Sequence, residues 1–145
     1  MKTARLVVAA AALLASGSAV AADVLMHRDP ECGCCEKWVR QVQAAFRHSV
    51  RTIDDPQRAA FQKRHGVPQR LSSCHTAIID GYVFEGHVPI ADMKKLLSMR
   101  PAGVSGLAVA GMPLGSPGME VPGGRADRYE VIAFGPAGER VFARH

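Results

Sequence analysis

The stretch VLMHRDPECGCCEKWVRQVQAAFRHSVRTIDD, residues 24–55, decides the fold because it holds three predicted elements in order. Val24–Met26 is a short apolar run typical of a strand. From Glu36 onward, apolar side chains recur at positions 38, 42, 45 and 46, the spacing of one helix face. Ser49–Ile53 alternates polar and apolar residues, which predicts a second strand. A βαβ unit is therefore expected, with a cysteine-rich loop between the first strand and the helix.

The chain that follows shows turn signals and periodic segments that extend this unit. A proline in the first turn marks the start of a helix, and a glycine just after the last turn marks its end. Asp-Gly between two apolar runs marks a hairpin. The predicted elements are a helix over Pro56–His65, strands over Thr76–Ile79 and Tyr82–Glu85, and a helix from Pro89 to Pro101. The order βαβαββα is typical of a thioredoxin-like fold, an α/β class with a mixed sheet and flanking helices.

The last third of the chain is rich in glycine and proline. Ala102–Asp127 shows little periodicity and predicts a long Gly/Pro/Met loop, and loops of this size are usually functional. Strands are expected over Tyr129–Phe134 and Arg140–Ala143, joined by the turn at 135–138. We therefore expect a C-terminal β-hairpin after the loop.

The N-terminus has the three-part pattern of a secretory signal peptide. Lys2 and Arg5 precede the apolar run Leu6–Ala15, and small residues follow up to Ala22. The run is shorter than the roughly 20 residues of a membrane span. We expect residues 1–22 to be a signal peptide that is cleaved near Ala21 or Ala22. Residues 23–145 are then expected to form one domain, which resides in the periplasm without membrane insertion.

Charge argues against a nucleic-acid partner. The formal net charge of +5 falls by two when the predicted signal peptide leaves. The remaining basic residues are scattered among acidic ones rather than gathered in a stripe, which indicates a solvated surface. We expect no nucleic acid among the partners.

Four cysteines carry the distinctive chemistry of the chain. An even number in an oxidising compartment first suggests disulfides. However, Cys32, Cys34 and Cys35 crowd three thiols into four residues, and a bond between vicinal cysteines is strained. This favours a soft-metal site over a structural disulfide framework. Two alternatives stay open: a thiol-disulfide oxidoreductase using the C-x-x-C pair Cys32 and Cys35, and a disulfide-stabilised binding module without catalysis.

Position strengthens the interpretation as a metal site. A helix N-terminus favours the thiolate forms of the three clustered cysteines, because its backbone N–H groups are unpaired. Cys74 and His75 precede the third strand, where a thioredoxin-like chain returns to face its first loop. Thiolate-rich sites select Cu(I), zinc or iron–sulfur clusters, and three crowded cysteines with one distant fit neither zinc nor ferredoxin spacing. Copper is the expected metal, with Cys32, Cys34, Cys35, Cys74 and His75 as ligands.

A second tier of candidate ligands lies outside these motifs. Met112 and Met119 lie in the glycine-rich loop, where they either add thioether ligands for Cu(I) or pack the loop against the site. His87 is a further candidate. The remaining histidines are interpreted as surface or hairpin residues.

Five motifs resemble a periplasmic metal-binding family of formerly unknown function that includes the CopG copper-resistance proteins. They are C-G-C-C-x-K-W at 32–38, S-C-H-T-A at 73–77, G-Y-x-x-E-G-H-V-P at 81–89, G-M-P-x-G-S-P-G-M-E at 111–120 and V-F-A-R-H at 141–145. The resemblance implies a thioredoxin-like fold and a role in periplasmic copper tolerance, with other periplasmic copper-handling proteins as partners. It also implies a multicopper cluster that interconverts Cu(I) and Cu(II), held by Cys32, Cys34, Cys35, Cys74 and His75.

Overall fold

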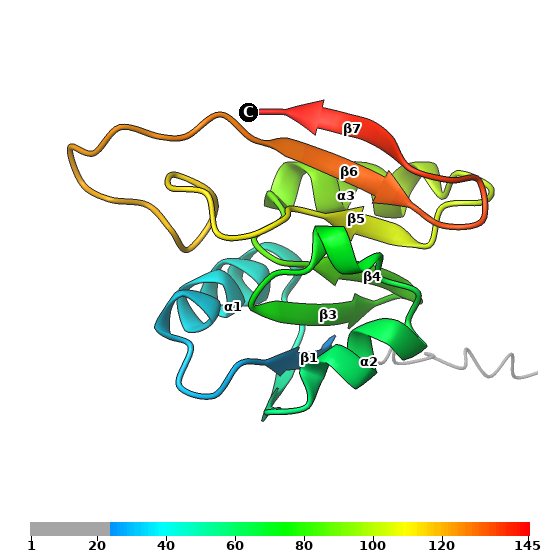
Figure 1. The fold of residues 1–145 in the computed structure, drawn as a ribbon. Helices are drawn as coiled ribbons and strands as arrows, with labels where there is room; N and C mark the ends of the chain where they lie inside the picture. The colour runs from blue at the N-terminus through cyan, green and yellow to red at the C-terminus, as the bar shows by residue number, and fades with distance from the viewer. Residues whose placement is uncertain (1–23) are drawn as a thin grey trace, which may run out of the picture.

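The fold is built on one seven-stranded mixed sheet (Figure 1). The computed structural model describes residues 24–145, so the predicted signal peptide lies outside the described residues. The strands lie in the order β2-β1-β3-β4-β5-β6-β7. Their bounds, and those of the helices, are β1 Val24–Arg28, α1 Gly33–Phe46, β2 Val50–Asp54, α2 Arg58–Arg64, β3 His75–Ile79, β4 Tyr82–Glu85, α3 Ile90–Met99, β5 Gly106–Ala108, β6 Glu130–Phe134 and β7 Arg140–Arg144, with a short 3-10 turn at Gln69–Leu71.

The predicted element order βαβαββα is confirmed through α3. β1 pairs in parallel with β2 and antiparallel with β3, so the first βαβ unit lies at one edge of the sheet. β3 and β4 form the predicted hairpin, turning at Asp80 and Gly81, both of which have positive φ. The C-terminal hairpin of β6 and β7 is also confirmed. The predicted α/β class is therefore correct, with three helices on a mixed sheet.

The prediction of one continuous loop over Ala102–Asp127 is wrong at its start. β5 forms there, pairing in parallel with β4 and antiparallel with β6, and it joins the C-terminal hairpin to the main sheet. A strand of three residues has no detectable period, so its conformation is set by its two neighbours. A Cβ at Gly106 would clash with the carbonyl oxygen of Val83, which explains the glycine at this close approach.

The two faces of the sheet carry different helices. Met26 of β1 packs in the main core with Trp38 of α1 and Met93 of α3. The next residue, His27, points to the opposite face, where its ring stacks on Phe61 of α2 at 3.7 Å between centroids. α1 and α3 thus cover one face and α2 the other.

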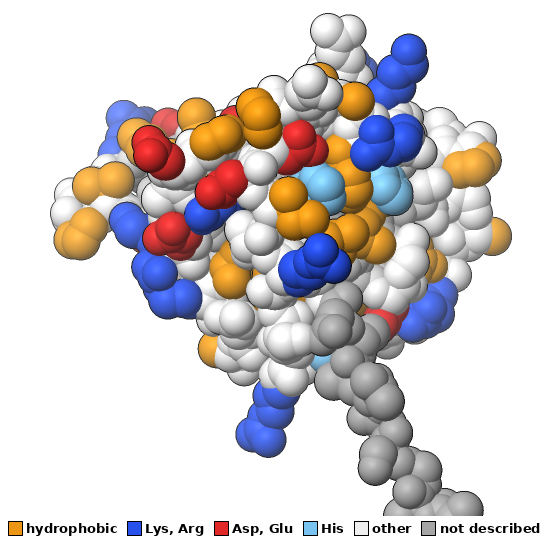
Figure 2. All heavy atoms as spheres, turned by 90° about the horizontal axis from the view of Figure 1, so that it is seen from below, with side chains coloured by type: hydrophobic (Ala, Val, Ile, Leu, Met, Phe, Trp, Pro, Cys, Tyr) orange, Lys and Arg blue, Asp and Glu red, His pale blue; other side chains and the backbone are white. Residues whose placement is uncertain are grey.

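The surface shows no segregation of charge by sign on the face drawn in Figure 2, where basic and acidic side chains lie among one another and histidines lie beside apolar groups. Among residues 24–145, no helix combines the length and apolar character needed to cross a membrane.

Candidate metal centre

The first turn of α1 carries three of the cysteines. The helix begins at Gly33 rather than at the predicted Glu36, with Cys32 as its N-cap. The sulfur of Cys32 accepts a hydrogen bond from the backbone N–H of Cys35 at 3.3 Å, the contact that a serine or aspartate oxygen makes at other N-caps. Cysteine is not one of the usual N-cap residues, so the sequence gives no start signal at Cys32 and the predicted start at Glu36 is three residues late.

The four cysteine sulfurs lie within 4.8 Å of one another. Cys32 and Cys35 are joined by a disulfide, while Cys34 and Cys74 are free thiols. The Sγ of Cys34 lies 3.3 Å from that of Cys32, and the Sγ of Cys74 lies 3.5 Å from that of Cys35. The structure therefore brings Cys74 next to the cysteines at the start of α1, and the four cysteines form one disulfide rather than the full pairing that their even number suggests.

Cys74 also belongs to a second group of potential ligands, with His75 and His87. The Sγ of Cys74 lies 3.5 Å from Nδ1 of His75 and 3.1 Å from Nε2 of His87. All three residues are buried, and the two imidazoles meet edge to face with 4.9 Å between ring centroids. His87, which had only second-tier standing from the sequence, lies as close to the fourth cysteine as His75 does.

Burial sets the protonation states of this group. It lowers the pKa of His75 well below its usual value and also lowers the pKa of His87, so both imidazoles are neutral at pH 7. Burial, followed by the neighbouring Cys34, raises the pKa of the Cys74 thiol to about 12. Neutral imidazoles are ready ligands, whereas the Cys74 proton must be displaced when a metal binds.

His75 supplies a direct test of whether a metal fits. Its Nε2 is buried and has no hydrogen-bond partner among the described residues, and a buried unpaired polar atom costs about 1–3 kcal/mol. The His75 ring packs against Trp38 with 4.5 Å between ring centroids. Thiols, neutral imidazoles and an unpaired buried nitrogen together fit a soft metal ion.

The glycine-rich loop fixes His87 and covers the start of α1. Nδ1 of His87 donates a hydrogen bond to the carbonyl of Pro117 at 2.8 Å, which leaves the Nε2 lone pair facing Cys74. A Cβ at Gly118 would lie 2.7 Å from the carbonyl oxygen of Cys34, so only glycine allows this approach. Figure 1 shows the segment after β5 at the same end of the sheet as the start of α1.

The two loop methionines are placed differently. Met112 is 54% exposed, and Met119 is half-buried. The contacts that tie the loop to the cysteine site are those of Pro117 and Gly118 described above. These contacts pack the loop against the site, and thioether ligation by Met112 and Met119 stays a prediction.

A buried polar network holds the residues on either side of Cys74 and His75, and it is not predicted from the sequence. Glu85 is fully buried in β4 and accepts hydrogen bonds from Gln62 at 2.5 Å, Thr76 at 2.5 Å and the backbone N–H of Ser73 at 2.7 Å. Arg58 lies 3.5 Å from the same carboxylate. The signal available in the sequence is a glutamate on the α2-facing side of a strand, directly opposite Thr76.

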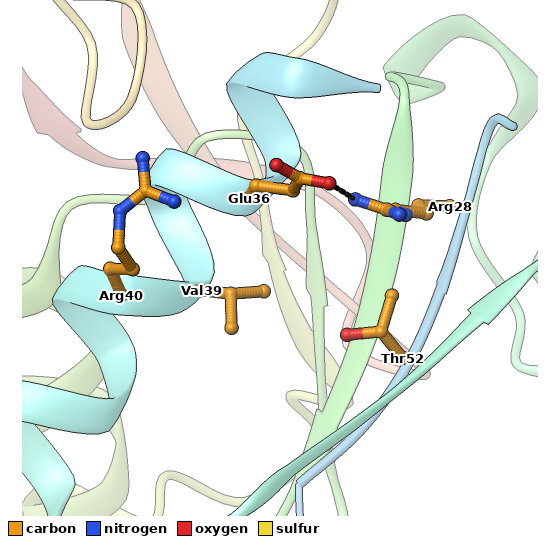
Figure 3. Close-up of a pocket in the computed structure, with 5 residues that line it drawn as sticks. All are labelled: Arg28, Glu36, Val39, Arg40 and Thr52. Carbon is orange, nitrogen blue, oxygen red and sulfur yellow. Dashed lines mark hydrogen bonds and ion pairs between the residues drawn. The ribbon is translucent and has the colours of Figure 1, made fainter. Parts of the chain in front are cut away.

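Arg28 ties the end of β1 to the start of α1. Its Nη1 donates to the carbonyl of Cys32 at 3.3 Å and to Glu36 at 3.1 Å, and its Nε donates to Asp54 at 2.6 Å. Figure 3 shows the Arg28–Glu36 pair at the rim of an open hollow of about 270 Å³ between α1 and the sheet, with Arg40 on its other side. The hollow is separate from the sulfur cluster, and Arg28 links the two.

Comparisons with known proteins show which chains this one is similar to. A family model described as a protein of unknown function, DUF411, matches residues 71–119, which include Cys74, His75 and His87. Two solved structures named copper resistance protein CopG, forms 1 and 2, are each 42% identical with a TM-score of 0.77. Each covers 85% of this chain, and the match spans 96% of the first and 97% of the second. No curated protein sequence matches the chain.

Proposed function

The chain belongs to the DUF411 family of the copper resistance protein CopG, and on that premise we propose that it binds copper and serves in copper tolerance. The copper is held as a multinuclear thiolate cluster by Cys32, Cys34, Cys35, Cys74 and His75, with His87 as a sixth ligand. The cluster interconverts Cu(I) and Cu(II).

One observation carries this proposal: two groups of donors share Cys74. The four cysteine sulfurs lie within 4.8 Å of one another. The ligand atoms of Cys74, His75 and His87 also lie within 4.8 Å of one another. Because the groups overlap at the sulfur of Cys74, its thiolate is placed to bridge a metal ion in one group and a metal ion in the other. Thiolate and imidazole are soft or borderline donors, so they suit Cu(I) better than they suit hard cations such as Mg²⁺ or Ca²⁺.

The setting of this function is also proposed. The signal-peptide pattern of residues 1–22 supports export to the periplasm, where other copper-handling proteins are the expected partners. The element order through α3 and the position of the cysteines at the start of α1 support a thioredoxin-like core.

An anaerobic Cu(I) titration of the reduced chain 23–145 against a chelator of known affinity tests copper binding. More than one tightly held copper per chain is expected, with fewer in Cys34→Ser and in His75→Ala. His65→Ala, on α2's face of the sheet, is the control for loss of an imidazole. Less than one tightly held copper, or retention unchanged by both site variants, would contradict the proposal.

The disulfide supports a second candidate, thiol-disulfide exchange by Cys32 and Cys35. Cys32 is half-buried at an N-cap and Cys35 lies behind it, an arrangement used by C-x-x-C oxidoreductases. That function leaves the buried group of Cys74, His75 and His87 without a role. An insulin-reduction assay separates the candidates: activity that is lost in Cys35→Ser and retained in Cys34→Ser favours the exchange function.

A further inference from the structure

Oxidation divides the candidate copper site into two sets of sulfur atoms. The sulfurs of Cys32 and Cys35 are bonded to each other, while those of Cys34 and Cys74 remain thiols. The group formed by Cys74, His75 and His87 contains neither sulfur of the disulfide. Donor atoms for a soft metal therefore persist after the disulfide has formed.

The backbone holds Cys32 and Cys35 in position to form this bond. Their Cα atoms are 5.3 Å apart, within the range of about 4.4–6.8 Å that a disulfide spans. The N-cap contact from the Cys35 N–H also holds the Cys32 sulfur 3.3 Å from the Cys35 backbone. The start of α1 therefore accommodates the disulfide with its N-cap contact intact.

Each remaining thiol lies beside one sulfur of the pair. Cys34 is 3.3 Å from Cys32 and Cys74 is 3.5 Å from Cys35, measured between sulfurs. A copper ion bound by a sulfur of the pair therefore already has a second sulfur within reach. That second sulfur does not take part in the disulfide.

Resting on the proposed copper function, we infer that the Cys32–Cys35 dithiol is an electron source that reduces cupric ions at this site. Two S–H bonds break and one S–S bond forms between Cys32 and Cys35. Each of two Cu(II) ions accepts one electron, and two protons pass to water. The two Cu(I) ions produced stay with Cys34, Cys74 and the two imidazoles, which are soft donors suited to the reduced ion.

The test mixes the fully reduced chain with two equivalents of Cu(II) without oxygen. Loss of the Cu(II) electron paramagnetic resonance signal measures reduction, and alkylation under denaturing conditions counts the remaining thiols. We expect the signal to disappear, the thiol count to fall from four to two, and the label to be found on Cys34 and Cys74 alone. Four thiols remaining, or labels spread over all the cysteines, would overturn the inference.

Cys32→Ser and Cys34→Ser form a matched pair, because both residues are half-buried at the start of α1, one as its N-cap and the other in its first turn. Serine at position 32 also preserves an N-cap, and circular dichroism checks that the helix is retained. In the time that the native chain needs to lose two thiols, Cys32→Ser is expected not to lose two. Cys34→Ser is expected to lose two thiols as the native chain does, but to retain less Cu(I) after gel filtration. An equal rate of thiol loss in Cys32→Ser and the native chain would contradict the assignment.

A parallel titration with Cu(I) separates this inference from the function on which it rests. If the reduced chain binds Cu(I) but leaves Cu(II) unreduced, the electron-source inference fails alone. If Cu(I) is not bound, the copper-binding proposal itself fails.

Discussion

Replacement of Glu85, the buried carboxylate that accepts hydrogen bonds from Ser73 and Thr76, should change how the free energy of unfolding depends on pH. Glu85 is fully buried, and burial raises its pKa to about 7 from an ordinary value of 4.5. The hydrogen bonds from Thr76, Ser73 and Gln62 and the charge of Arg58 favour the carboxylate but do not offset its desolvation. The folded state therefore holds this proton more tightly than the unfolded state does.

The sign and size follow from linkage. Because the pKa of Glu85 is higher in the folded state, its contribution to stability is full below pH 4.5 and is lost as the pH rises through about 7. At about 1.4 kcal/mol per pKa unit, the free energy of unfolding loses about 3 kcal/mol across this window. Glu85→Gln keeps the shape of the side chain and removes the titration.

The measurement is urea unfolding of the metal-free, disulfide-bonded chain from pH 4 to 8, followed by the fluorescence of Trp38. Titration of His75 and His87, whose pKa values are lowered, has the opposite sign but is common to both proteins. It therefore cancels when the two profiles are subtracted. We expect the free energy of unfolding of the native chain, minus that of Glu85→Gln, to fall by about 3 kcal/mol over the window.

A control removes a carboxylate elsewhere. Glu130→Gln makes the same chemical change at an exposed position of β6, paired with Arg144 at 2.9 Å. Parallel profiles for the native chain and Glu85→Gln, differing by a constant within 1 kcal/mol, would refute the assignment of the slope to Glu85.

Three further outcomes are expected. Gly118→Ala should lower the free energy of unfolding by about 1–3 kcal/mol more than Gly123→Ala, because both have positive φ but only Gly118 lies against backbone; equal losses in thermal or urea unfolding would contradict this. Fluorescence of Trp38, the only tryptophan, should be quenched as copper binds beside His75, and an unchanged emission would place the copper elsewhere. Cu(I) affinity should rise about tenfold per pH unit for each thiol proton displaced, Cys74 included, since its pKa is about 12; competition titrations that show no pH dependence would contradict proton displacement.

Local patterns predicted most of the fold. The helical spacing of Trp38 and Val42 and the Asp80-Gly81 turn each specify their element without help from distant residues. β5 escaped prediction because Gly106–Ala108 becomes a strand only through pairing with β4 and β6. Such a segment has no local signal beyond the glycine that its neighbour requires.

In the candidate site, too, local features could be predicted from the sequence and contacts between distant segments could not. Crowding of Cys32, Cys34 and Cys35 is visible in the sequence, and so is the pairing of Cys74 with His75. The approach of His87 depends on a sharp turn at Gly86, where a Cβ would lie 2.5 Å from the Val109 carbonyl, and on the carbonyl of Pro117. These contacts join segments far apart in the chain, so no spacing rule could rank His87 beside His75.

The most direct test of the copper site is a crystal structure of the fully reduced chain loaded with Cu(I) without oxygen, with anomalous maps collected at the copper edge. We expect anomalous peaks enclosed by the sulfurs of Cys32, Cys34, Cys35 and Cys74, with the imidazoles of His75 and His87 as neighbours. Peaks confined to histidines outside the cluster, such as His65 or His145, with no peak among the four sulfurs, would contradict this copper site.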